Sequence, residues 1–151
     1  MSSFNEDLER GFEVEYAVLE IIRKKYPSAS LINAYKGYDI WVPELHKSVE
    51  VKYDPMSNET GNIVIEIEMN GKLSALSTTT ADYWVFHDDH VFIIMKPMSI
   101  VNCIFQNKLQ YVEFVGDGDR ASKKAFLVPK ELLFKHGKRL GEADAKNNTN
   151  T

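Results

Sequence analysis

The stretch YDIWVPELHKSVEVK, residues 38–52, contains two short runs in which apolar and polar side chains alternate. Alternation with a period of two is typical of half-buried β-strands. The polar connection at 43–46 predicts a hairpin in which Val42 pairs with Lys47. This pairing places the aliphatic side chains of both strands on one face, where they supply part of a core. The charged side chains are left on the other face.

Three charged side chains are expected to meet on that second face. The predicted register sets Asp39 directly across from Glu50, and Lys52, two residues further on, has the same orientation. Two facing carboxylates repel each other, whereas Mg²⁺ is typically held by one or two carboxylates with water and phosphate oxygens. A lysine beside such a cation can orient a water molecule or stabilise charge on a phosphate oxygen. A merely solvated charged face is the alternative, and these residues alone leave it open.

The same residues resemble the PD-(D/E)XK nuclease superfamily, in which an Asp on one strand precedes a Glu-x-Lys on the next. The matching positions are Asp39 and Glu50-Val51-Lys52, and Tyr38 stands where the motif's proline would be. The resemblance implies that Asp39 and Glu50 bind Mg²⁺ or Mn²⁺. It further implies that the carbonyl of Val51 is a metal ligand and that Lys52 takes part in catalysis.

Residues 3–26 are predicted to form a first helix that carries one more acidic candidate. Glu15 falls in a gap of the apolar stripe, and burying an unpaired carboxylate is costly, so it needs a partner. The resemblance adds that many of these nucleases carry a metal-site Glu on this helix, in a spacing that Gly11 and Glu15 match. We expect Glu15 at the metal site, and a solvent-facing Glu15 is the alternative. The predicted stripe consists of Leu8, Phe12, Leu19, Ile22 and Tyr26.

A second motif lies in residues 60–84, which contain T-G-N, I-E, G-K-L-S and T-T-A-D-Y-W in that order. This stretch resembles a phage and bacterial branch of the superfamily that is related to Holliday-junction resolvases. Ala75 and Thr80 depart from that branch, which has glycine and lysine at these positions. Glu66 is a candidate for a further metal-side carboxylate, and a solvated strand residue is the equal alternative. With this motif the resemblance covers about residues 3–134.

The charge of the chain is uneven. The formal net charge is −4, yet residues 120–139 carry seven bases and one acid, while residues 1–20 carry six acids and one base. A basic segment in an acidic protein can contact phosphates, although composition alone favours a solvated helix and loop. The candidate phosphate ligands are Lys123, Lys124 and Lys130.

The length of 151 residues suits one domain, expected at 1–140, followed by a disordered tail at 141–151. No apolar run approaches the roughly 20 residues that cross a membrane, and the acidic N-terminus is unlike a signal peptide. Cys103 is the only cysteine, which excludes an internal disulfide and fits a reducing cytosol. We therefore expect the cytoplasm of a bacterial or phage-infected cell.

The fold is predicted to be α/β, with a restriction-endonuclease-like core in which helices flank a mixed β-sheet of about five or six strands. The predicted function is a Mg²⁺-dependent DNA endonuclease, with a resolvase-like choice of DNA structure left open. A catalytically inactive nuclease-like DNA-binding or structural protein is the alternative. Cleavage of paired strands would favour a two-fold homodimer. Further strands are expected at 29–35, 62–69, 81–86, 91–95, 111–115 and 125–128, helices at 99–106 and 129–135, and turns at 70–71 and 87–90.

Overall fold

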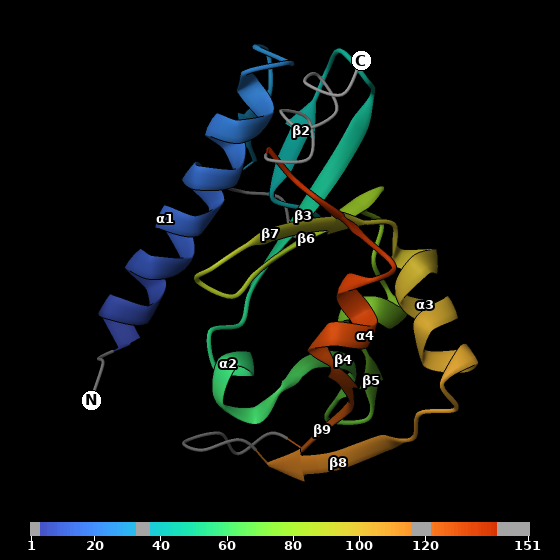
Figure 1. Cartoon of the computed structure of the whole chain (residues 1–151). Helices are drawn as coiled ribbons and strands as arrows, with labels where there is room; N and C mark the ends of the chain where they lie inside the picture. Colours follow the sequence, from blue (N-terminus) through green and yellow to red (C-terminus); the bar gives the residue numbers. More distant parts are fainter. Residues whose placement is uncertain (1–3, 33–36, 116–121, 142–151) are drawn as a thin grey trace.

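The computed structural model describes residues 4–32, 37–115 and 122–141. In these ranges the protein is mixed α/β, with a six-stranded mixed sheet, a four-stranded antiparallel sheet and four α-helices (Figure 1). The larger sheet has the order β1 (Ser30–Leu31), β2 (Ile40–Val42), β3 (Lys47–Tyr53), β6 (Tyr83–His87), β7 (Phe92–Met95), β10 (Lys138–Arg139). The smaller has the order β5 (Lys72–Leu73), β4 (Asn62–Met69), β9 (Ser122–Pro129), β8 (Tyr111–Val115). The helices are α1 (Phe4–Arg23), α2 (Ser57–Thr60), α3 (Pro97–Gln106) and α4 (Lys130–Phe134), with a 3-10 helix η1 (Ala75–Ser77).

The β2–β3 hairpin has the register that the sequence predicts. Val42 pairs with Lys47 in the antiparallel ladder. On its other side β3 pairs in parallel with β6, which sets Val51 beside Val85. Because a parallel pair requires a crossover connection, the chain leaves the sheet between them through residues 54–82, which contain α2, β4, β5 and η1. The hairpin and β6 are therefore at the centre of the larger sheet.

Helix α1 packs on one face of the larger sheet. Its buried side chains Val18 and Ile22 belong to one cluster with strand residues such as Val49. The predicted stripe is wrong at Phe12, whose side chain is 45% exposed, whereas Val14 is only 8% exposed. Positions 14, 18 and 22 recur every four residues, and a residue two positions from Val14 points to the opposite side of the helix.

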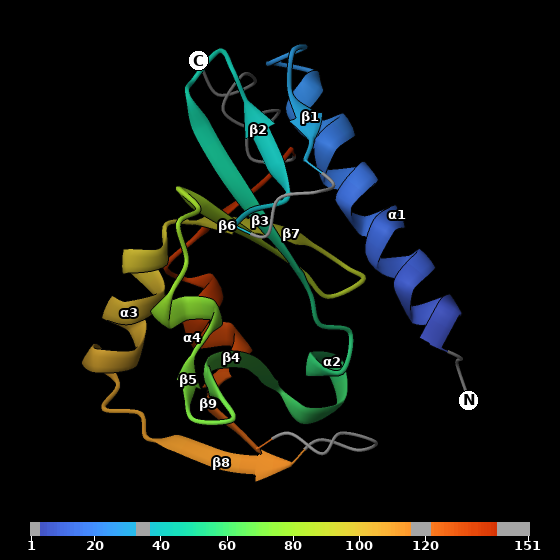
Figure 2. The same cartoon turned by 180° about the vertical axis from the view of Figure 1, so that it is seen from behind.

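The opposite face of the larger sheet carries the second part of the core. Trp84 and Phe86 of β6 pack with Ile63 of β4, Ile100 of α3 and Leu133 of α4. Figure 2 shows α3, α4 and the smaller sheet together on the side of β3 and β6 that lies away from α1. The two faces of the larger sheet are thus both covered, as the near-continuous apolar run of β6 requires.

The separate four-stranded sheet is a correction to the prediction of one sheet. Strand β4 has the predicted bounds and turns at Asn70 and Gly71, whose positive φ angles of 51° and 78° suit a tight hairpin. Its other neighbour is β9, which pairs with it from Asn62–Pro129 to Met69–Lys123. This pairing joins segments about sixty residues apart, and alternation within a strand does not specify its partner.

Most of the remaining elements agree with the sequence except at their ends, whereas the sequence did not predict β5, η1 and β10. Helix α3 begins at Pro97 rather than after Met98, since proline is well suited to the first helical position. Helix α4 begins at Lys130, and Pro129 is the residue before it. A short helix, α2, follows β3, where the sequence predicted no helix. Residues 88–91 connect β6 and β7 as the predicted turn.

Several expectations fall outside the described residues, namely the end of the first strand at 33–35 and almost all of the tail. Within the described ranges, no helix combines the length and the apolar character needed to cross a membrane.

Candidate active site

The β2–β3 hairpin holds Asp39 in a fixed position. The backbone N–H of Asp39 donates to the carbonyl of Val49 at 2.9 Å, although the regular pairing of β2 with β3 ends at Ile40 and Val49. One carboxylate oxygen, Oδ2, accepts the N–H of Val51 at 2.7 Å. The side chain is therefore tied to the middle of β3, and its charge acts on the neighbouring acid, Glu50.

Glu50 is the most strongly perturbed carboxyl group of the site. Its side chain is 19% exposed. Burial first, then the charge of Asp39 and a hydrogen bond to it, raise the pKa of Glu50 to about 8, against a smaller lowering by Lys52. A carboxyl group whose pKa is this high is stabilised by a proton or by a cation, because either removes the repulsion between the two acids.

Lys52 lies on the same face as Glu50, as the alternation of β3 predicts. Its Nζ is 3.9 Å from Oε1 of Glu50 and 5.1 Å from the centre of the Trp84 ring. The Trp84 ring is itself fixed, since its Nε1–H donates to Oγ1 of Thr79 at 2.9 Å. The ammonium group is thus held beside the carboxyl pair by a rigid aromatic surface.

Glu15 reaches the same region from α1. Burial first, and then the charge of Asp39, raise the pKa of Glu15 to about 7. The charge of Glu15 in turn contributes to the raised pKa of Glu50. Glu15 therefore occupies a half-buried position of α1 from which its charge acts on the hairpin acids, and its place at a metal site stays a prediction.

The acidic groups form a pair with a third group nearby rather than a closed cage. Within the described residues, no three His, Cys, Asp or Glu side chains stand close enough to hold one metal ion together. Asp39 and Glu50 supply two carboxylates, which is the number that Mg²⁺ ordinarily takes from a protein before water and phosphate complete its shell. A ligand role for the Val51 carbonyl stays a prediction.

Glu66 is not brought to this pair. It lies on β4 of the smaller sheet, where it accepts the hydroxyl of Ser74 at 2.8 Å. Its other carboxylate oxygen is 3.9 Å from Nζ of Lys123. These contacts account for the charge of Glu66, and its predicted metal role has no support from its position.

The three candidate phosphate ligands differ in their surroundings. Lys124 pairs with Glu68 at 2.9 Å, and Lys123 lies beside Glu66 as described above. Lys130, in contrast, is only 18% exposed and donates to Oδ2 of Asp88 at 2.8 Å and to Oδ1 of Asn58 at 2.7 Å. Lys130 thus joins α4 to the β6–β7 turn and to α2.

Asp88 shows how strong this link is. Burial favours a raised pKa, but the hydrogen bond from Lys130 and those from the N–H groups of Val91 and His90 outweigh it and lower the pKa to about 2. The prediction that 87–90 is a turn agrees with this arrangement. The sequence did not indicate the ion pair, because Lys130 lies forty-two residues away.

The T-T-A-D-Y-W motif supports the hairpin from the adjacent strand. Oδ2 of Asp82 accepts the backbone N–H of Ser48 at 2.9 Å and its hydroxyl at 3.1 Å. Thr79 accepts the ring N–H of Trp84 and also the N–H of Ala81, at 3.2 Å. These side chains fix β6 against β3, so the motif positions the site without contributing to its charge. The hydroxyl of Thr80 lies only 3.5 Å from the carbonyl of Gly37.

Two polar residues beside the site were not singled out from the sequence. Tyr53, which follows Lys52, donates its hydroxyl to Asp89 at 2.7 Å and also hydrogen bonds with Arg10 of α1. Tyr53 and Arg10 both line a cavity of about 300 Å³ between α1 and the ends of β3 and β6. Glu13 is exposed and also lines this cavity.

Comparison of the chain with known proteins gives no match to a family model, to a curated protein or to a solved structure.

Proposed function

We propose that the protein is a metal-dependent DNA endonuclease with a restriction-endonuclease-like core. The observation that carries the proposal is the register of the β2–β3 hairpin. It brings Asp39, which lies one residue before β2 and hydrogen bonds with Val49 and Val51, beside Glu50, and Nζ of Lys52 is 3.9 Å from Glu50. Two acids and a lysine on one strand face are the set that the PD-(D/E)XK resemblance requires, and α1 adds Glu15 to it.

The donor set fits a hard divalent cation. Asp39 and Glu50 would hold Mg²⁺ or Mn²⁺, since oxygen ligands suit both ions and the cation would take the place of the proton that a raised Glu50 pKa implies. Glu15 is placed to accept a hydrogen bond from water in the shell of the ion. When bound, the cation supplies Lewis acidity that favours attack of water on a phosphate.

The protein's own groups have separate tasks in that reaction. Hydrolysis forms a bond from water oxygen to phosphorus and breaks the bond to the leaving sugar oxygen, which takes up a proton. Lys52 would orient the attacking water or stabilise charge on the phosphate oxygens, and its position beside Trp84 limits the directions its ammonium can take. Asp39 keeps the two strands in register through Val51.

DNA is the proposed partner, and the proposed location is the cytoplasm of a bacterial or phage-infected cell. If the protein cleaves paired strands, a two-fold dimer is the expected form. Lys123 and Lys124 remain the proposed phosphate contacts, because both are partly exposed on the smaller sheet. Lys130 is the weakest of the three, since Asp88 and Asn58 already accept its hydrogen bonds.

A nuclease-like DNA-binding protein without turnover is the second candidate. The observation that favours it is Thr80, which stands where the related branch has lysine and whose exposed side chain bears no charge. The complete Asp39, Glu50 and Lys52 set favours the enzyme instead.

The two candidates differ in a plasmid assay. Supercoiled plasmid is incubated with the protein and Mg²⁺ or Mn²⁺, with EDTA in the control. The enzyme converts the plasmid to the nicked or linear form only when the metal is present. DNA that shifts in a gel but stays supercoiled in both metals supports the inactive binding protein and contradicts the proposal.

A further inference from the structure

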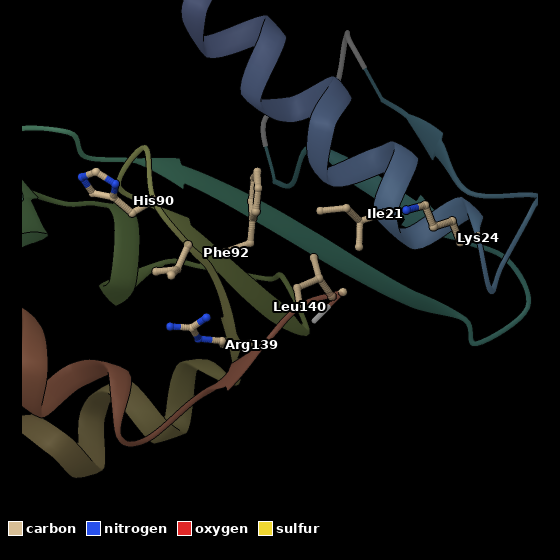
Figure 3. A pocket seen from close by; sticks show the side chains of 8 residues that line it. Ile21, Lys24, His90, Phe92, Arg139 and Leu140 are labelled. Carbon is tan, nitrogen blue, oxygen red and sulfur yellow. The ribbon is translucent and has the colours of Figure 1, made fainter. Parts of the chain in front are cut away.

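A second surface, on the α1 side of the larger sheet, is hollowed. One cavity of about 400 Å³ lies between α1, β7 and β10, and Figure 3 shows Ile21 of α1 and Leu140 after β10 among its lining side chains. A cavity of about 410 Å³ lies between α1 and the β2–β3 hairpin. Ile21 and Leu140 line both cavities, so the two are adjacent, and together they are called the α1 groove.

The α1 groove is basic. Among the described residues, no Asp or Glu lines either cavity, although the net charge of the chain is −4. Figure 3 shows Lys24, His90 and Arg139 around the first cavity. The basic lining residues are Lys24, Lys25, Lys47, His90, Lys138 and Arg139.

The helix dipole explains only part of this charge. Lys24 and Lys25 directly follow α1, where cations complement the negative end of a helix. Lys47 is the first residue of β3 and Lys138 is the first residue of β10. The dipole of α1 therefore gives no reason for a positive charge at these two strand positions. Neither lysine forms an ion pair with an acid in the described part of the chain. A site for negative charge accounts for all of them together.

The floor of the groove restricts the kind of anion. It is formed largely by aliphatic side chains, among them Ile21, Val42, Ile94 and Leu140. A DNA phosphate backbone could pair with the basic side chains, but it has no apolar group to place against this aliphatic floor. Carboxylates that alternate with apolar side chains would satisfy both the basic rim and the apolar floor.

We propose that the α1 groove binds an acidic peptide segment of a partner protein. Apolar side chains of the segment enter the two cavities, and its carboxylates face Lys47 and Lys138 on the sheet and Lys24 on the helix side. The groove lies on the face of the sheet opposite to Glu50 and Lys52, so this inference does not depend on the proposed nuclease activity.

The probe is a short fluorescein-labelled peptide of alternating Glu and Leu, measured by anisotropy. Two matched peptides replace Leu by Ser or Glu by Lys. The double variant Lys47→Glu, Lys138→Glu is compared with Lys72→Glu, an exposed lysine on β5 far from the groove in sequence and on the other sheet. We expect the Glu–Leu peptide to bind, with affinity that falls as salt rises and that drops about tenfold or more in the double variant.

Glu50→Gln and Lys72→Glu should bind the peptide as the wild type does, and melting curves show that every variant is folded. Absence of Glu–Leu peptide binding, unchanged affinity in the double variant, or equal binding of the Ser or Lys peptide overturns the proposal. A labelled DNA duplex that binds in place of the peptide, and is lost in the double variant, assigns the groove to nucleic acid and also overturns it.

Discussion

Asp39 accepts a hydrogen bond of 2.7 Å from the backbone N–H of Val51, across the hairpin that carries the candidate site. The carboxylate therefore has a structural role beside its proposed role at the metal. Asp39→Ala leaves the Val51 N–H without its partner, a loss of about 1–3 kcal/mol. Asp39→Asn keeps an acceptor oxygen and removes the charge.

We expect both variants to lose cleavage, and only Asp39→Ala to melt at a clearly lower temperature. Thermal melting followed by circular dichroism measures the difference. Equal melting temperatures for the two variants would show that the hydrogen bond to Val51 contributes nothing to stability.

The raised pKa values of Glu50 and Glu15 predict how stability depends on pH. Between the ordinary pKa of 4.5 and about 8 for Glu50, or about 7 for Glu15, the folded protein binds more protons than the unfolded chain. The free energy of unfolding that these groups contribute therefore falls as the pH rises through this window. We expect the metal-free protein to melt a few degrees lower at about pH 8 than at about pH 5.

Metal should reverse this trend. A divalent cation competes with the protons, so Mg²⁺ or Mn²⁺ should raise the melting temperature at high pH and have little effect at low pH. Glu50→Gln is the control, because its amide cannot titrate and should flatten the pH dependence. Stability that rises with pH across this window in the metal-free wild type would contradict the assignment.

Lys130 should act mainly on stability. Asp88 is 3% exposed, so Lys130→Ala leaves a buried carboxylate without its cation, and we expect a loss of about 3–5 kcal/mol in the free energy of unfolding. Lys135→Ala, at an exposed lysine five residues further on, is the control and should change little.

DNA binding separates Lys130 from Lys124. Lys124→Ala should weaken binding and reduce the salt slope by about one, as loss of one phosphate contact does. Folded Lys130→Ala protein at low temperature should keep the salt slope of the wild type. A reduced salt slope in Lys130→Ala would show instead that Lys130 contacts a DNA phosphate.

Lys52 has two conceivable roles, and its neighbours favour catalysis. A structural lysine would only neutralise Asp39 and Glu50, and its removal would lower stability and metal affinity together. A catalytic lysine acts most strongly on the transition state, so Lys52→Ala should slow turnover by about two to three orders of magnitude. Folding should persist, and metal affinity should stay or increase. Single-turnover nicking beside melting with and without Mg²⁺ measures both. Nicking at the wild-type rate would exclude catalysis by Lys52.

The hairpin and its charges were accessible from the sequence because they are local. Alternation over 38–52 and a short polar connection specify which residues face each other, and the register at Val42 and Lys47 is the predicted one. The turn at Asn70 and Gly71 was readable for the same reason, since both residues tolerate positive φ.

The rest required contacts that no local pattern encodes. The pairing of β4 with β9, which makes the second sheet, joins distant segments. The ion pair of Asp88 with Lys130 does so as well, and composition alone presented Lys130 as a free cation. The predicted stripe of α1 was wrong at Phe12, because the buried face follows the four-residue spacing of Val14, Val18 and Ile22 and not the size of the apolar side chains.

The most direct test of the proposed site is the nicking rate of supercoiled plasmid by wild type and by Glu50→Gln, measured side by side at saturating Mg²⁺ or Mn²⁺. Both proteins are first shown to be folded by their melting curves. We predict that the wild type nicks the plasmid, that EDTA abolishes the reaction, and that Glu50→Gln nicks at least about a hundredfold more slowly, because the cation that assists the reaction loses one of its two carboxylate ligands. No nicking by the wild type in either metal, or nicking by Glu50→Gln at the wild-type rate, would contradict the account.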